Sequence, residues 1–319
     1  MIQKKNKSRI LIFLALAFGI SWATALVIYL TGGLENGISW QIAGAQIPLA
    51  LVLLSTFYMF GPAIAHVLTR LITKEGKENL LLRPRFKQGR WLYFLAGWFL
   101  PAFLILAGAG LFFILFPRYF DPNLSALKLQ MENLGSLPEI NPWVIVAVQT
   151  IQAMLLAPLL NTIPTFGEEF GWRGYLLPKL LPLGARKAVL LVGVIWGIWH
   201  WPVILMGYNY GLDYFGAPFL GPLAMVWFTL SLSVIFSWLT IKAGSVWPAV
   251  IAHGAVNGIA AIGLIFVNGN PDPLLGPTPV GIIGGLGLML TAILLLLLPG
   301  ALNPRQDPQT DQTPSADLG

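Results

Sequence analysis

Residues 91–116 read WLYFLAGWFLPAFLILAGAGLFFILF, with no Asp, Glu, Lys or Arg among them. A helix needs about 20 consecutive, mainly apolar residues to cross the hydrocarbon core of a bilayer. The stretch is long enough and apolar enough to do so, and it predicts a transmembrane helix. A helix suits this environment because lipid offers the backbone no hydrogen-bond partner, and a helix bonds its own polar groups.

Seven further stretches of the same kind lie before and after it. Of the 319 residues, 56% are hydrophobic and only 10% are charged, whereas about a quarter of the residues of a soluble domain carry a charge. We therefore expect an all-α membrane protein with about eight transmembrane helices in one domain, residues 1–302, followed by a disordered polar tail, residues 303–319. The seven other helices are expected near Ile10–Leu30, Ile47–Thr69, Pro142–Thr162, Ala188–Met206, Pro218–Ile241, Val246–Val267 and Val280–Leu298.

The positive charges sort by the side of the membrane to which each loop is assigned. When successive loops alternate between the two sides, Arg118 and Lys128 alone of the 19 Lys and Arg residues fall opposite the termini. Cytoplasmic loops carry an excess of Lys and Arg, so we expect both termini in the cytoplasm of a multi-pass protein of the plasma membrane. The net charge of +6 is then explained by membrane topology. We expect the lipid bilayer as a partner and no nucleic acid. The basic stretch Lys74–Arg90 either lies against anionic lipid headgroups or is a solvated loop.

Three clusters of polar residues interrupt the apolar stretches. Ionisable residues within membrane segments are costly and mark candidate functional sites. The first cluster is FGEEFGWR, residues 166–173. On a helix, Glu169 and Arg173 are four residues apart and can pair, whereas Glu168 points to another face and has no partner nearby in the sequence. A plain salt bridge at the membrane edge is the alternative for Glu169 and Arg173, but an unpartnered Glu168 favours a functional role.

The second and third clusters each contain a histidine. His200 lies in WGIWHWP, residues 196–202, and the third cluster is HGAVN, residues 253–257. His253 and Asn257 are four residues apart and share a helix face. A lone histidine such as His200 is more often a packed or interfacial residue, and His253 with Asn257 could serve only as a polar contact between helices. The third histidine, His66, stands alone on an apolar face and is interpreted as structural.

Taken together, the clusters favour hydrolysis at a carbonyl group. A carboxylate and a histidine can activate a water molecule, while a second histidine and an amide can stabilise the oxyanion that forms. Alternatively, Glu168, His200 and His253 are the ligand set of a catalytic divalent metal such as zinc, with the fourth position open. The chain has no cysteine and no HExxH motif, so a metal site would have to assemble across separate helices.

In this order and on separate helices, the clusters resemble the CPBP family of intramembrane proteases. That family includes the type II CAAX prenyl endopeptidases and bacterial proteins grouped with bacteriocin self-immunity. Its signature is Glu-Glu-x-x-x-Arg, then Phe-x-x-x-His, then His-x-x-x-Asn or Asp. The corresponding motifs, within a family core of about residues 152–267, are Glu168-Glu169-x-x-x-Arg173, Trp196-x-x-x-His200 and His253-x-x-x-Asn257. Trp196 replaces the usual Phe, and an aromatic ring is retained at this position, so we expect the packing of the helix that carries His200 to be preserved.

The resemblance also implies a role for each matched residue. Glu168 and His200 are implied to activate the water, and His253 and Asn257 to stabilise the oxyanion. The site is supported by Glu169, Arg173 and Trp196. Family members are described both as metalloproteases and as metal-independent glutamate proteases, which leaves a zinc cofactor open.

The expected activity is that of an intramembrane endopeptidase whose active site opens to the cytoplasmic side. Its substrate would be a peptide or a membrane protein, cut at a CAAX-type C-terminus or in a leader sequence. Two other functions remain alternatives. An ion- or proton-coupled transporter also uses intramembrane Glu, His and Asn residues, and a non-catalytic immunity protein would share the fold without the chemistry.

Overall fold

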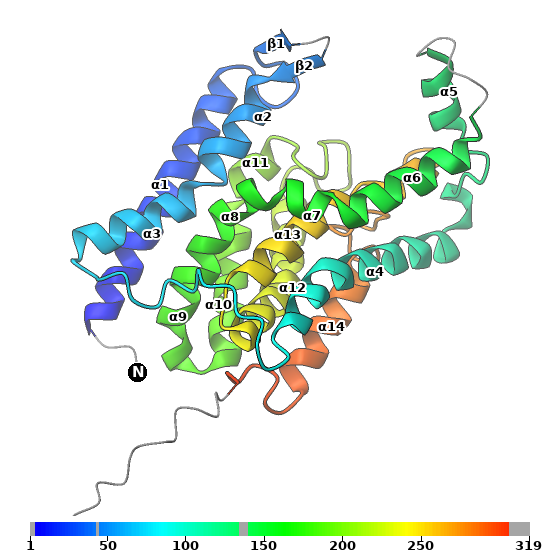
Figure 1. Ribbon diagram of the computed structural model, residues 1–319. Helices are drawn as coiled ribbons and strands as arrows, with labels where there is room; N and C mark the ends of the chain where they lie inside the picture. The colour runs from blue at the N-terminus through cyan, green and yellow to red at the C-terminus, as the bar shows by residue number, and fades with distance from the viewer. Residues whose placement is uncertain (1–3, 43–44, 134–139, 306–319) are drawn as a thin grey trace, which may run out of the picture.

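A computed structural model describes residues 4–42, 45–133 and 140–305 of the chain. Of the tail expected to be disordered, only residues 303–305 fall within the described part. The described residues form a mainly helical bundle (Figure 1). Its α-helices are α1 (Lys4–Leu30), α2 (Leu49–Leu53), α3 (Gly61–Ile72), α4 (Trp91–Leu115), α5 (Ser125–Asn133), α6 (Pro142–Leu155), α7 (Ala157–Leu160), α8 (Thr162–Gly171), α9 (Leu177–Leu180), α10 (Ala185–Trp199), α11 (Trp201–Leu205), α12 (Leu220–Ala243), α13 (Trp247–Ile259) and α14 (Leu286–Leu297).

Five short turns of other helical types join these elements. Two are π-helical, η1 (Leu54–Tyr58) and η3 (Trp172–Leu176). Three are 3-10 turns, η2 (Pro117–Tyr119), η4 (Leu181–Leu183) and η5 (Ile262–Phe266). η1 follows directly on α2, and η3 follows directly on α8.

Several helices are long and apolar enough to cross a membrane, and the chain is an integral membrane protein. Each of these segments corresponds to one of the predicted stretches. The predicted stretch Ala188–Met206 is divided between α10 and α11 at His200, and α6 and α14 are apolar but shorter. The count of eight spans and the cytoplasmic placement of the termini stay predictions. Within the described residues, the five long segments are Lys4–Leu30, Leu49–Ile72, Trp91–Leu115, Leu220–Ala243 and Trp247–Phe266.

A small hairpin departs from the expected all-α fold. Strands β1 (Ser39–Ile42) and β2 (Ala45–Pro48) are antiparallel, with Ser39 opposite Pro48. They lie at the tip of the connection between α1 and α2 (Figure 1). A four-residue strand places only two side chains on each face, which is too few for an alternating pattern to be recognised in the sequence.

The stretch predicted as one helix at Pro142–Thr162 is broken into three. α6 ends at Leu155, α7 is a single turn with Pro158 near its start, and α8 begins at Thr162. Proline has no N–H to continue the helical bonding, and Figure 1 shows the chain changing direction at α7. A straight helix rising about 1.5 Å per residue would have carried Glu168 past the far edge of the bilayer. The break instead brings α8 into the bundle.

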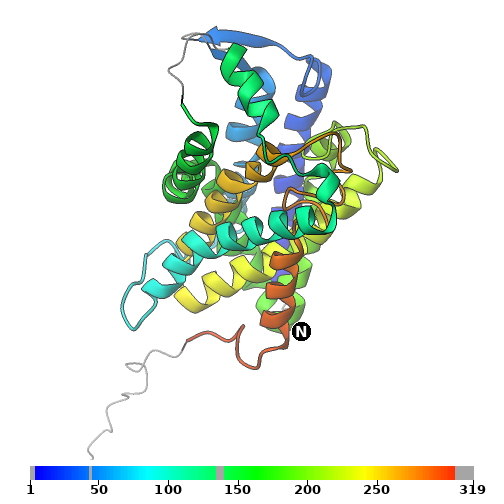
Figure 2. The ribbon, with the colours of Figure 1, turned by 90° about the vertical axis from the view of Figure 1, so that its right-hand side faces the viewer.

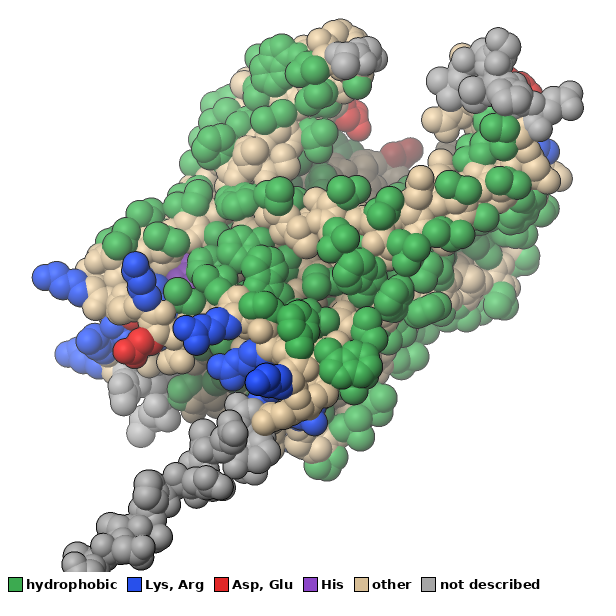
Figure 3. All heavy atoms as spheres, in the orientation of Figure 1, with side chains coloured by type: hydrophobic (Ala, Val, Ile, Leu, Met, Phe, Trp, Pro, Cys, Tyr) green, Lys and Arg blue, Asp and Glu red, His purple; other side chains and the backbone are tan. Residues whose placement is uncertain are grey.

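The surface of the bundle is apolar on its flanks and basic at one end. Figure 3 shows hydrophobic side chains over much of the visible face, and Lys and Arg gathered near the start of α1 and the end of α3. Large exposed side chains include Leu11, Ile114, Leu160 and Leu297. Apolar exposure on this scale is unusual for a soluble monomer, and it suits helices that face lipid.

The core is built around α12 and α13. α12 packs against α10, α4 and α14, and α13 packs against α4, α7 and α8, an arrangement seen from the side in Figure 2. Hydroxyl groups join these helices by bonding to backbone carbonyls. Ser233 on α12 donates to Val189 on α10 at 2.8 Å, and Thr165 on α8 donates to Val250 on α13 at 3.1 Å. Hydrogen bonds of this kind commonly stabilise contacts between helices in membranes.

Two glycines bring α8 unusually close to the first part of the chain. A Cβ atom placed on Gly167 would lie 2.7 Å from the carbonyl oxygen of Met59, and one on Gly171 would lie 2.4 Å from the Cβ of Pro62. Real Cβ atoms do not approach other atoms this closely, so a larger residue would push α8 away from α3. Since Glu168 lies between these glycines, their small size fixes the depth of the carboxylate in the bundle.

Replacing Gly171 by alanine should destabilise the protein. Overpacking a well-packed interior costs about 1–3 kcal/mol, so Gly171→Ala should lower the melting temperature of the purified protein in detergent. Gly110→Ala in α4 is the matched control, because a Cβ there meets no atom within 4 Å and alanine is the better helix former by about 0.5–1 kcal/mol. A melting temperature for Gly171→Ala equal to or above that of the control would contradict the close approach.

Candidate active site

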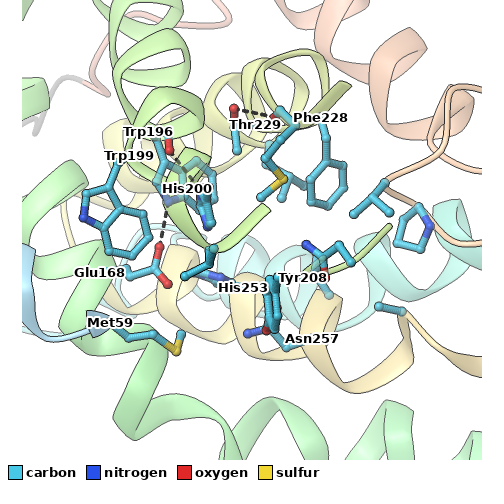
Figure 4. A pocket seen from close by; sticks show the side chains of 18 of the residues that line it. Met59, Glu168, Trp196, Trp199, His200, Tyr208, Phe228, Thr229, His253 and Asn257 are labelled. Carbon is cyan, nitrogen blue, oxygen red and sulfur yellow. Dashed lines mark hydrogen bonds between the residues drawn. The ribbon is translucent and has the colours of Figure 1, made fainter. Parts of the chain in front are cut away.

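Glu168 is buried in α8 and bonded by a side chain from another helix. Its side chain is 2% exposed, and its Oε2 accepts a hydrogen bond from Nε1 of Trp196 on α10 at 2.6 Å (Figure 4). The carboxylate therefore has a partner that its sequence neighbourhood did not reveal. A phenylalanine, usual at this position in the resembling family, has no N–H to donate. Trp196, which stands where the family usually has Phe, is thus the residue that donates a hydrogen bond to Glu168.

Glu169 is fully buried and bonds two groups at once. Its carboxylate lies 3.0 Å from Nη1 of Arg173 and 2.9 Å from Nδ1 of His253. The first contact is the expected pair four residues apart, and the second joins α8 to α13. Arg173 is also fully buried, with its Cζ 4.3 Å from the ring centre of Trp196 and 5.2 Å from that of Phe236. Aromatic faces attract a cation in this position, so the arginine is held by one carboxylate and two rings.

His200 lies at the break between α10 and α11. Its Nδ1 is 2.8 Å from the carbonyl oxygen of Trp196. A carbonyl oxygen can only accept, so Nδ1 carries the proton and the neutral ring keeps a lone pair on Nε2. His200 is therefore arranged to accept a proton at Nε2. Trp196 fixes both Glu168, through its indole, and His200, through its main chain.

The three motifs meet at one cavity of about 110 Å³. Glu168, His200, His253 and Asn257 all line it, and Figure 4 shows them around a common space. Asn257 follows His253 by one helical turn. Glu169 lies behind this wall, where its carboxylate bonds the far side of the His253 ring. The structure thus brings together residues that the sequence placed on three separate helices.

The first part of the chain contributes to the site without any motif of its own. Tyr58 and Met59 line the cavity. The Tyr58 hydroxyl donates to the carbonyl oxygen of Trp199 at 2.6 Å, and Nε1 of Trp22 donates to the same oxygen at 3.1 Å. These bonds fasten α1 and η1 to the residue before His200. Tyr58 ends a π-helical turn, a distortion frequent at functional sites that no sequence motif indicated.

Two further segments close the cavity, and sequence reasoning missed both. Tyr208 and Asn209 come from the loop between α11 and α12, and Pro279 and Val280 come from the segment before α14. A tyrosine in a connecting loop is common, so only its place in the fold shows that Tyr208 borders the site.

His66 is buried in α3 but does not stand alone, as its sequence neighbourhood suggested. Its Nδ1 lies 2.9 Å from the carbonyl oxygen of Phe170, and its Nε2 accepts from Nε of Arg70 at 2.7 Å. The expectation of isolation was wrong because one of its partners lies across a helix interface. His66 does not line the cavity and joins α3 to α8 beside Glu169.

The arrangement does not match a metal centre. Among the residues that the structure describes, no three His, Cys, Asp or Glu side chains come close enough together to hold a metal ion. The side chains present give no support to zinc ligation by Glu168, His200 and His253, and we assign no catalytic step to a metal.

Comparisons with known proteins agree with the motifs. Residues 146–259 match the family model described as type II CAAX prenyl endopeptidase Rce1-like. A relative from Methanococcus maripaludis, CAAX prenyl protease 2, is 33% identical over 101 residues, which make up 31% of this chain and 37% of the relative. The match therefore spans little more than a third of that relative. Residues 146–259, which contain all three motifs, are thus similar to the Rce1-like type II CAAX prenyl endopeptidases.

Proposed function

We propose that the protein is an intramembrane endopeptidase that hydrolyses a peptide bond near the cytoplasmic face of the plasma membrane. The observation that carries this proposal is the meeting of Glu168, His200, His253 and Asn257 at one cavity within a membrane bundle. A carboxylate, two imidazoles and an amide are the groups that peptide hydrolysis needs for a base and for oxyanion donors. The sorting of Lys and Arg supports the cytoplasmic side.

Glu168 and His200 activate the attacking water in this proposal. The carboxylate and Nε2 of His200 both accept hydrogen bonds, so a water between them donates its two hydrogens and keeps a lone pair for the carbonyl carbon. As the water oxygen bonds to that carbon, one of its protons passes to the acceptor that acts as the base. Trp196 positions both acceptors, because its indole N–H bonds Glu168 and its main-chain carbonyl bonds His200.

Asn257 and His253 stabilise the negative charge that develops on the carbonyl oxygen. The Asn257 amide donates an N–H, and His253 donates from Nε2 when it is doubly protonated. Glu169 holds the His253 ring through Nδ1 at 2.9 Å, and Arg173 holds Glu169 at 3.0 Å. These two residues therefore orient the site without touching the substrate.

A CAAX-type C-terminus is the first substrate to test, because the matched family and the relative both carry that name. A farnesylated CAAX peptide, the same peptide without the lipid and a leader-type peptide separate the substrate classes. Each is offered to the purified protein in liposomes.

Glu168→Gln should abolish cleavage of whichever peptide the wild type cuts. Glutamine keeps the shape and a hydrogen-bond acceptor for Trp196 but is no base, and loss of a general base costs about 10²–10⁴-fold in rate. Glu132→Gln is the matched control, since Glu132 is an exposed acid on α5. Product formation is followed by mass spectrometry, with melting temperatures to verify folding. Wild-type rates for Glu168→Gln would reject the proposed base.

Asn257→Ala distinguishes the metal-free mechanism from a zinc mechanism. Removing one oxyanion donor should lower kcat by about 10²–10³-fold, or about 2.7–4 kcal/mol. A metal would polarise the carbonyl itself, and the same change would then cost less. Chelators should leave the wild-type rate unchanged. Stoichiometric zinc that is lost together with activity on chelation, and restores it, would contradict the metal-free mechanism.

A further inference from the structure

The cavity offers more hydrogen-bond acceptors than donors. The Glu168 carboxylate and Nε2 of His200 accept, while the Trp196 N–H is engaged with Glu168 and Nδ1 of His253 with Glu169. When His253 is singly protonated, its Nε2 is also an acceptor. Of the five motif residues that line the cavity, which are Glu168, Trp196, His200, His253 and Asn257, Asn257 alone then has a donor free for an oxyanion. Oxyanion holes commonly use two or more donors.

Tyr208 supplies a second donor at the same cavity. It lines the cavity from the loop between α11 and α12 and is drawn on the side of His253 and Asn257 in Figure 4. Within the described residues, its hydroxyl has no hydrogen-bond partner. The other two tyrosines near the cavity differ in this respect, because the hydroxyls of Tyr58 and Tyr210 donate to the carbonyl oxygens of Trp199 and Val280.

The loop holds Tyr208 in a defined position. Gly207 and Asn209 on either side adopt left-handed backbone angles, with φ of 96° and 67°, and glycine and asparagine tolerate this conformation best. The backbone N–H of Tyr208 donates to the carbonyl oxygen of Val203 at 3.0 Å. The chain therefore makes a tight turn after α11, and Tyr208 lies at its bend.

The Tyr208 phenol keeps its proton under physiological conditions. Its side chain is 42% exposed at the edge of the cavity, yet desolvation by the surrounding protein and then the negative charge of Glu168 raise its pKa above the ordinary value of 10.0. A protonated phenol is a hydrogen-bond donor, and proximity to the Glu168 charge places it within the electrostatic reach of the site.

We infer that Tyr208 is a further catalytic residue, whose hydroxyl donates a hydrogen bond to the carbonyl oxygen of the scissile peptide, beside Asn257. The inference rests on the proposed endopeptidase function. The bond strengthens as the oxygen becomes an oxyanion, and the phenol forms no covalent bond and keeps its proton. It provides a second donor that does not depend on a second proton on His253.

Tyr208→Phe tests this role by removing only the hydroxyl. We expect kcat to fall by about 10²–10³-fold, the cost of one oxyanion donor, with little change in KM because the donor acts mainly in the transition state. Tyr210→Phe removes a hydroxyl from the same loop that bonds a carbonyl instead, and it should keep the wild-type kcat. The probe is the peptide that the wild type cleaves, and both variants are checked by thermal melting.

Several outcomes would overturn the inference. A wild-type kcat for Tyr208→Phe, a loss confined to KM, or an equal loss of kcat in Tyr210→Phe would each do so, the last because it would assign the effect to order in the loop. Glu168→Gln, measured in the same series, separates this result from the proposed function. Cleavage that needs Glu168 but not the Tyr208 hydroxyl rejects only Tyr208, whereas cleavage that does not need Glu168 rejects the endopeptidase mechanism itself.

Discussion

The buried ion pair between Glu169 and Arg173 is the interaction on which the rest of the site depends. Both side chains are fully buried, and an unpaired charge there would cost about 3–5 kcal/mol. Because the same carboxylate bonds His253, the pair joins α8 and η3 to α13, and the contact of Arg173 with the Trp196 ring adds α10. The three segments that carry the proposed catalytic residues are therefore held together by one buried network of side chains.

The packing around this network is what lets a polar site exist within a membrane bundle. Because Gly171 has no side chain, α3 packs closely against α8, and the break near Pro158 turns α8 into the interior. Bonds from Tyr58 and Trp22 to the Trp199 carbonyl fasten the first part of the chain beside His200. The first two features position Glu168 on α8, and the third positions His200 at the end of α10. Holding reacting groups in one geometry is a major source of enzymatic rate enhancement. The proposed activity would therefore account for the number of contacts that hold the residues around this small cavity in place.

Much of this could be predicted from the sequence, because the features concerned are local. Apolar length predicted the long helices, spacing by four residues predicted the pair of Glu169 with Arg173, and the ordered motifs predicted the resemblance to the family whose model matches residues 146–259. Contacts between helices have no such periodic pattern. The bond from Trp196 to Glu168 and the place of Tyr208 therefore appeared only in the structure. The β-hairpin was missed because its strands are too short to show alternation.

The most direct test of the central role of the ion pair compares Glu169→Gln, Arg173→Gln and the double variant in thermal melting and in cleavage rate. Each single change leaves a buried charge unpaired, so we expect both to lower the melting temperature strongly. The double variant buries no lone charge and should recover much of that loss, yet kcat should stay low because the Glu169 carboxylate no longer orients His253. Single variants that melt and cleave like the wild type, or a double variant whose losses simply add, would contradict the role given to the pair.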